Sequence, residues 1–121
     1  MSSTALITLV GNVGREPETR YTPNGRMNVQ FTMAVSRRRT DAGGNLQETT
    51  NWFRITAWGR LAETLDGLAA RGYLARGRQV FVSGQFEARE YQDQQGVPRI
   101  SLDVTAIDVF LLGTTQAREG E

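Results

Sequence analysis

Cysteine, histidine and lysine are all absent from this sequence of 121 residues. Without cysteine there can be no disulfide, no thiolate zinc site and no thiol nucleophile. Without histidine there can be no Ser-His-Asp triad and no imidazole general base. The Gly-rich segment 11–14 lacks a lysine and leads into no helix, so it is not a nucleotide-binding phosphate loop. We therefore expect a protein that is not an enzyme and that needs no metal or other cofactor.

Long apolar runs are absent too, and none approaches the roughly 18 residues that a transmembrane helix requires. Residues 5–13 are apolar enough for a signal peptide, but no cationic segment precedes them and no cleavage site follows. Together with the lack of cysteine, this predicts a cytoplasmic protein. The length fits one domain, which we place at residues 1–113, followed by a short polar tail at 114–121.

The 14 basic residues are all arginine, and 13 residues are acidic. The composition of the source genome would explain this preference. So would phosphate binding, because arginine presents a planar fork of donors to an anion. Residues 1–60 hold eight arginines and four acids, whereas residues 61–121 hold six arginines and nine acids. The first half should therefore attract a polyanion more strongly than the total charge suggests.

Alternation of apolar and polar residues predicts mostly β-structure, and it is cleanest from Met27 to Ser36. Other strands are expected over about 4–10, 47–58 and 79–91 and from about residue 99 onward. Leucines spaced at i, i+4 and i+7 predict a helix over about 60–71, with Gly72 at its C′ position. The apolar phase of the last strand shifts near Thr105-Ala106, which indicates a β-bulge.

This order of elements is typical of the all-β OB-fold, a five-stranded Greek-key barrel with one helix between the third and fourth strands. A β-sandwich and another small barrel are the alternatives. The position of the single helix, inside the chain and not at a terminus, favours the OB-fold.

The strand at 51–58 carries the clearest functional signal. Strand alternation puts Trp52, Arg54 and Trp58 on one face and Phe53 with its neighbours on the other. A charge between two tryptophans would be costly in a core, although a twisted strand could still bury one of the two rings. An exposed face of this kind suits single-stranded nucleic acid, whose bases stack on aromatic rings while cations meet the phosphates.

Two further segments are basic or aromatic. Arg37, Arg38 and Arg39 end the cleanest strand just before a Gly-rich loop, where they form either a solvated hairpin end or a phosphate clamp. Arg89, Tyr91 and Arg99 lie in the last predicted hairpin, where Tyr91 is either a plain surface aromatic or a base platform. Tyr21 and Tyr73 stand outside any such pattern, and we interpret them as packing residues.

Three motifs, in the right order, resemble the DNA-binding domain of bacterial single-stranded DNA-binding proteins. They are LITLVGNVGREPETRYTPNGRMNVQFTMAVS, TNWFRITAWGRLAE and GRQVFVSGQFEAREYQDQQGVPR. The resemblance covers residues 4–113 and implies an OB-fold that binds single-stranded DNA. It also implies a homotetramer around which the strand wraps, and hence a cytoplasmic, nucleoid-associated protein.

The resemblance assigns roles to individual residues. Trp52, Trp58 and Tyr91 match stacking positions of the family. At the position of Trp58 the family often has phenylalanine, and at the position of Tyr91 it usually has tryptophan. Phe53 matches a position at the subunit interface. Four arginines match basic positions along the DNA path: Arg20, Arg54, Arg60 and Arg89.

The sequence also departs from the family pattern. Arg39 stands where a stacking tryptophan is common, Glu90 replaces a basic residue, and the segment 61–79 is a few residues longer than usual. An acidic C-terminal tip through which the family recruits replication and repair proteins is not found in residues 114–121. Such partners are therefore expected only if the full gene product carries that tip.

These features predict a protein that binds single-stranded DNA with little sequence preference and protects it during replication, repair and recombination. Two binding modules remain as alternatives. One is an OB-fold replication-restart protein, which would lack the full aromatic set. The other is a sugar- or protein-binding barrel, whose binding would respond little to salt.

Overall fold

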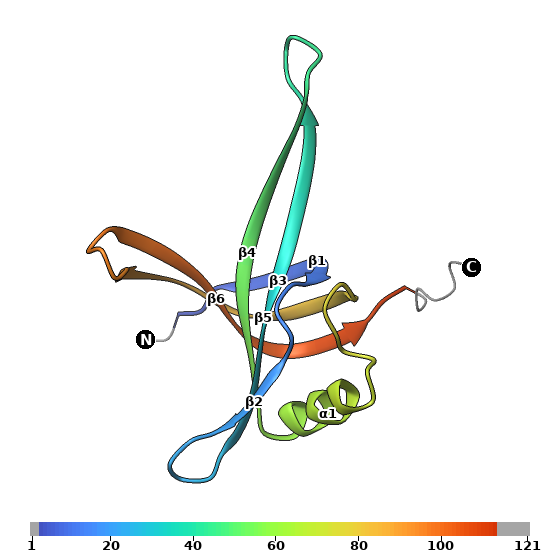
Figure 1. Cartoon of the computed structure of the whole chain (residues 1–121), viewed down its shortest axis with the longest axis vertical. Helices are drawn as coiled ribbons and strands as arrows, with labels where there is room; N and C mark the ends of the chain where they lie inside the picture. The colour runs from blue at the N-terminus through green and yellow to red at the C-terminus, as the bar shows by residue number, and fades with distance from the viewer. Residues whose placement is uncertain (1–2, 114–121) are drawn as a thin grey trace.

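The computed structural model of the chain describes residues 3–113 and contains six strands and one helix (Figure 1). The elements are β1 (Leu6–Val13), β2 (Glu18–Tyr21), β3 (Met27–Thr40), β4 (Leu46–Trp58), α1 (Gly59–Ala70), β5 (Gln79–Gln92) and β6 (Pro98–Leu111). The long strands and the helix lie close to the predicted ranges. The short strand β2 was not predicted, because all four of its side chains are exposed and leave no burial pattern in the sequence.

Five strands close into a barrel. They are hydrogen-bonded in the order β1-β5-β6-β4-β3, and β3 returns to β1 through the pairs Asn12↔Ala34 and Val13↔Met33. The β4–β6 pairing is parallel and the other pairings are antiparallel, while β2 adds to the outer edge of β3. The closed barrel with one helix between β4 and β5 confirms the predicted OB-fold.

The core of the barrel consists of the residues that the apolar–polar alternation predicted to face inward. Val29, Phe31 and Met33 of β3 are buried against Ile55 and other apolar residues of β4. Helix α1 covers one end of the barrel through Ala62 and Leu65, its two buried residues. Each large buried side chain contributes on the order of 1.5–3 kcal/mol of hydrophobic stabilisation.

The predicted β-bulge is present in β6. Ser83 of β5 pairs with Asp108, but the next residue, Gly84, pairs with Ala106, so that Ile107 has no partner. The bulge is thus one residue beyond the predicted position at Thr105-Ala106. Bulges bend a strand and raise its twist, and this one lies where β6 curves around the barrel (Figure 1).

Two hairpins project from the barrel. Strands β3 and β4 run on together past the barrel as a long two-stranded finger, residues 36–50, whose side chains are all exposed (Figure 1). Strands β5 and β6 form a second projection, the β5–β6 hairpin, residues 87–100, which leaves the barrel in another direction (Figure 1). The predicted polar tail at 114–121 lies outside the described residues.

Candidate nucleic-acid interface

The outward face of β4 carries the predicted pair of tryptophans. Phe53, Ile55 and Ala57 are buried, so the alternating positions point away from the core. Trp52 is 56% exposed, whereas Trp58 is half-buried. The two rings therefore differ: Trp52 offers most of a ring to solvent, and Trp58 offers part of one.

A glycine positions the indole of Trp52. A Cβ atom placed on Gly14 would lie 2.3 Å from Cζ3 of Trp52, so this ring packs directly on the backbone at Gly14. The same ring borders a hollow of about 530 Å³ that is also lined by Arg15, Glu16 and Arg76. Trp52 thus stands beside two cations and one acid, which suits a stacking platform next to a phosphate.

A second hollow on the same face holds three arginines. It has a volume of about 400 Å³ and is lined by Arg15, Arg20 and Arg54, among others. Glu18 also lines it and is ion-paired with Arg20, with Nη2 and Oε1 2.7 Å apart. Both groups of that pair are well exposed, so the pair is weak and its arginine can exchange the carboxylate for a phosphate. Arg15 borders both hollows and joins them.

Trp58 lies at the other end of the face, at the start of α1. The guanidinium carbon of Arg26 lies 4.5 Å from the centre of its ring, a cation–π contact. Arg60 follows in the first turn of the helix and is exposed, but it lines neither hollow. Trp58 is therefore a platform already covered in part by a cation.

The finger divides its three arginines between two faces. Arg38 lies opposite Glu48 and, by strand alternation, on the same face as Trp52. Arg37 and Arg39 lie on the other face. All three are exposed and make no side-chain hydrogen bond or ion pair within residues 3–113. The predicted cluster is thus two separate cationic surfaces on one hairpin.

The tryptophan face continues across β6 onto β5. Arg54 of β4 pairs with Asp103 of β6, which in turn pairs with Glu87 of β5. Alternation along β5 then brings Arg89 and Tyr91 to the same face. Tyr91 is exposed, and the guanidinium carbon of Arg89 lies 5.6 Å from the centre of its ring. Arg99 lies opposite Tyr91 and is ion-paired with Asp93 at 3.1 Å.

Asp103 interrupts the cations of this continuous face. Its Oδ2 lies 3.0 Å from Nε of Arg89, and its Oδ1 accepts a hydrogen bond from the hydroxyl of Ser101. Partial burial acts to raise the pKa of Asp103, but the hydrogen bonds from Ser101 and Arg89 outweigh it and hold the pKa below its ordinary value. Asp103 is therefore charged at neutral pH and occupies Arg89 as an ion-pair partner.

Two tyrosines contradict their predicted role. Tyr21 and Tyr73 were predicted to be packing residues, and both are exposed. The prediction was wrong because β2 and the segment after α1 lie on the surface, which no periodicity in these short segments indicates. Phe53 is only 7% exposed and packs edge-on against Phe86 in the chain's own core, with ring centres 6.4 Å apart. Its predicted interface role stays a prediction.

Sequence reasoning missed four residues of this surface: Gly14, Arg15, Arg26 and Arg76. Arg15 and Arg26 each follow a Gly-containing turn signal, and a search for arginines beside such turns would have found them. The contacts of Gly14 and Arg76 with the Trp52 region depend on tertiary packing. In residues 3–113 no cluster of acidic side chains could hold a metal ion, and no helix has the length and hydrophobicity needed to cross a membrane.

Comparison with protein families decides the relationship of this chain. The model of the single-strand binding protein family matches residues 5–112. The chain belongs to this family. Among curated members, single-stranded DNA-binding protein 1 of Chlorobaculum tepidum is 36% identical over 115 residues, which is 94% of this chain and 68% of that protein. The single-stranded DNA-binding protein of Neisseria meningitidis is 35% identical over 94% of this chain and 63% of its own length.

Solved structures of the family agree in fold. The small single-stranded DNA-binding protein of Streptomyces coelicolor superposes with a TM-score of 0.74 at 31% identity, covering 92% of this chain and 96% of that one. A Plasmodium falciparum family member in complex with single-stranded DNA superposes with a TM-score of 0.73 at 25% identity, covering 93% and 98%. Both similarities extend over nearly the whole barrel.

Proposed function

We propose that this chain binds single-stranded DNA without strong sequence preference, on the face formed by β4 and its neighbours. Bases would stack on Trp52, Trp58 and Tyr91, and arginines around the two hollows would contact phosphates. The observation that carries the proposal is Trp52, an exposed indole that lines one hollow with Arg15 and Arg76. Arg15 joins this hollow to the second one, which Arg54 also lines. The family's DNA complex from Plasmodium falciparum supports it.

Low sequence preference follows from this chemistry. A stacked base presents its π face, which all four bases share, and a phosphate carries no sequence information. Such a protein needs no catalytic group. We therefore propose a non-enzymatic role in which the chain covers single strands that replication, repair and recombination expose.

We also propose that the chain acts as a homo-oligomer, with a tetramer as the expected form. Val10, Phe81 and Phe110 pair in register across β1, β5 and β6 and form an outward apolar row, in which the two phenylalanine rings lie 5.9 Å apart. The edge of β1 opposite β5 pairs with β3 only at Asn12 and Val13. An open strand edge beside an exposed apolar row fits a second copy of the chain related by a two-fold axis.

The affinity for oligothymidylate over a series of salt concentrations tests the DNA-binding proposal, with a blunt duplex and a neutral oligosaccharide as competitors. If about four arginines in each subunit contact phosphates, the log–log slope is about −3 per subunit. The duplex and the sugar should compete poorly. A flat salt response, or efficient competition by the sugar, would instead favour a sugar- or protein-binding barrel.

A further inference from the structure

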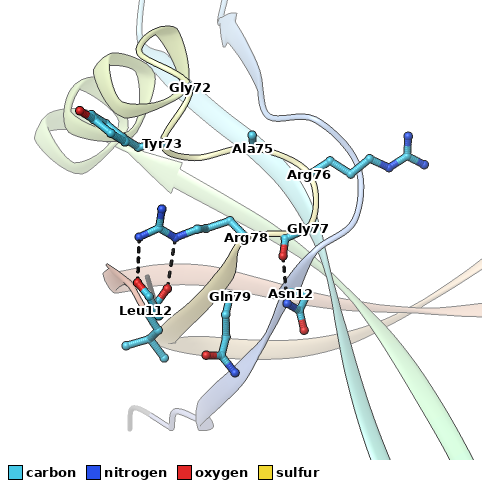
Figure 2. Close-up of a pocket in the computed structure, with 10 residues that line it drawn as sticks. Asn12, Gly72, Tyr73, Ala75, Arg76, Gly77, Arg78, Gln79 and Leu112 are labelled. Atoms are coloured by element: carbon cyan, nitrogen blue, oxygen red, sulfur yellow. Dashed lines mark hydrogen bonds between the residues drawn. The ribbon is translucent and has the colours of Figure 1, made fainter. Parts of the chain in front are cut away.

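A third hollow lies where the chain leaves α1 and enters β5 (Figure 2), and no residue of β4 lines it. It has a volume of about 560 Å³, and Tyr73, Arg76 and Arg78 line it from one side and Asn12 and Leu112 from the other. We propose that this hollow, the helix-exit hollow, continues the path of single-stranded DNA beyond Trp52. A base would stack on Tyr73 and a phosphate would lie at Arg76. The inference rests on the proposed function.

Arg76 connects the helix-exit hollow with the Trp52 platform. It lines both this hollow and the one beside Trp52, so a strand that leaves the indole meets Arg76 next. Figure 2 shows Tyr73 and Arg76 on one loop, with their side chains pointing in opposite directions. Arg76 makes no side-chain hydrogen bond or ion pair within residues 3–113, so its donors are available to a phosphate.

The end of α1 holds Tyr73 on the surface. Gly72 takes a left-handed conformation with φ of 83°, and its N–H donates to the carbonyl of Ala69 at 3.0 Å. The N–H of Tyr73 donates to the carbonyl of Leu68 at 2.9 Å, which completes a Schellman motif. The next residue, Leu74, is buried in the core. Anchored on both sides, the Tyr73 ring stays 47% exposed, as a stacking platform must be.

The other end of the hollow is fixed to the barrel. Gly77 N–H donates to the carbonyl of Val13 at 2.7 Å, and Asn12 Nδ2 donates to the carbonyl of Gly77 at 3.1 Å. Nε of Arg78 donates to the carbonyl of Leu112 at 3.2 Å (Figure 2). The hollow therefore exists before any ligand arrives, and binding need not order the loop first.

The charge of the segment suits a polyanion. Residues 71–78 contain three arginines and no acid, although this half of the chain is acidic as a whole. An exposed ring, free guanidinium donors and a local excess of positive charge match the combination that single-stranded DNA requires. A ligand without phosphates would use the ring but not the cations.

A tryptophan reporter tests the proposal in the full chain. The variant Trp52→Phe/Trp58→Phe/Tyr73→Trp keeps an aromatic ring at each platform and carries its only tryptophan in the helix-exit hollow. On saturation with long oligothymidylate, we expect its fluorescence to be quenched, and we expect the fluorescence of the parent protein to be quenched through Trp52 and Trp58. Unchanged fluorescence of the reporter beside a quenched parent would overturn the inference and leave the proposed function intact. Unchanged fluorescence in both proteins would overturn both.

Affinity gives an independent test. Binding is measured for a series of oligothymidylates from about 4 to about 16 nucleotides long. Tyr73→Ala should weaken binding of the longer members by about 5-fold to 100-fold, which is the range expected for the loss of one stacked base. The shortest members, which Trp52 and its neighbours can hold alone, should bind as they do to the parent. Tyr73→Phe is the matched control and should bind like the parent at every length. Equal binding of Tyr73→Ala and the parent at every length would contradict the proposal.

Discussion

At the scale of single residues, Trp52 depends on a glycine that is distant in the sequence. The indole occupies the space that a side chain at position 14 would fill, and the same ring borders the hollow with Arg15 and Arg76. The platform is therefore the product of one strand and two loops, and a change at position 14 should affect it as strongly as a change in β4.

Gly14→Ala should displace the Trp52 ring, because a Cβ at 2.3 Å from Cζ3 cannot be accommodated without movement. We expect weaker binding of oligothymidylate, by about 5-fold to 100-fold, and a shifted tryptophan emission maximum. Gly43→Ala is the matched control, because a Cβ there makes ordinary contacts of 3.4 Å or more. Parent-like binding by Gly14→Ala would show that the ring position does not matter.

Asp103 restrains the cations of the same face. Asp103→Asn removes the negative charge that pairs with Arg89 and should strengthen binding by about 2-fold to 10-fold, with a log–log salt slope steeper by about 0.7 for one more phosphate contact. The control is Asp108→Asn, because Asp108 pairs with Ser83 on the outer surface. This control should leave the slope of the salt dependence unchanged. A shallower slope for Asp103→Asn would contradict this role.

The same substitution has a pH-dependent effect on stability. Because the pKa of Asp103 is lowered in the folded chain, its charge stabilises the fold above the ordinary value of 3.8 and this stabilisation is lost as the pH falls through the lower folded value. Asp103→Asn should therefore unfold at lower urea concentration than the parent at pH 7. The difference should narrow in strongly acidic solution, and a difference that grows with acid would exclude this explanation.

At the scale of elements, the finger presents cations on two faces. Arg38→Ala should weaken binding of short oligothymidylate more than Arg37→Ala does, because only Arg38 shares the face of Trp52. With long strands, which can reach both faces, the two variants should lose similar affinity. Fluorescence titrations at one salt concentration measure both effects, and equal losses with the shortest strands would mean that the two faces act as one.

The sequence predicts the elements of this molecule better than it predicts their contacts. Strand β3 was recognisable because its inner half alternates between core and solvent, but the finger extends past Ser36 to Thr40, where exposure on both sides removes the pattern. Trp52 was identified from its own strand. Gly14, on which its ring packs, and Arg76, which lines the same hollow, belong to segments far from β4 in the chain, and nothing in the local pattern indicates either neighbour.

At the scale of the whole molecule, the two sides of the barrel differ in chemistry. One side carries the tryptophans and the two hollows that Arg15 joins. The surface of β1, β5 and β6 carries the apolar row of Val10, Phe81 and Phe110. A molecule with separate cationic and apolar surfaces can associate with a second copy through the apolar surface and bind a nucleic-acid strand through the cationic surface.

Phe110→Asp should convert the proposed oligomer into smaller species, because it places a charge in the apolar row, beside Phe81. Light scattering after size exclusion measures the mass directly. Leu46→Asp is the matched control, since Leu46 is more exposed than Phe110 but lies at the tip of the finger. An unchanged mass for Phe110→Asp would place the interface elsewhere.

The most direct test of the central claim follows Trp52 alone. In the variant Trp58→Phe, Trp52 is the only tryptophan, and oligothymidylate is added at a low and a high salt concentration. We predict strong quenching of Trp52 and tighter binding at the lower salt concentration. If the folded variant shows no quenching at either concentration, Trp52 is not a base-stacking platform and the proposed DNA-binding face is wrong.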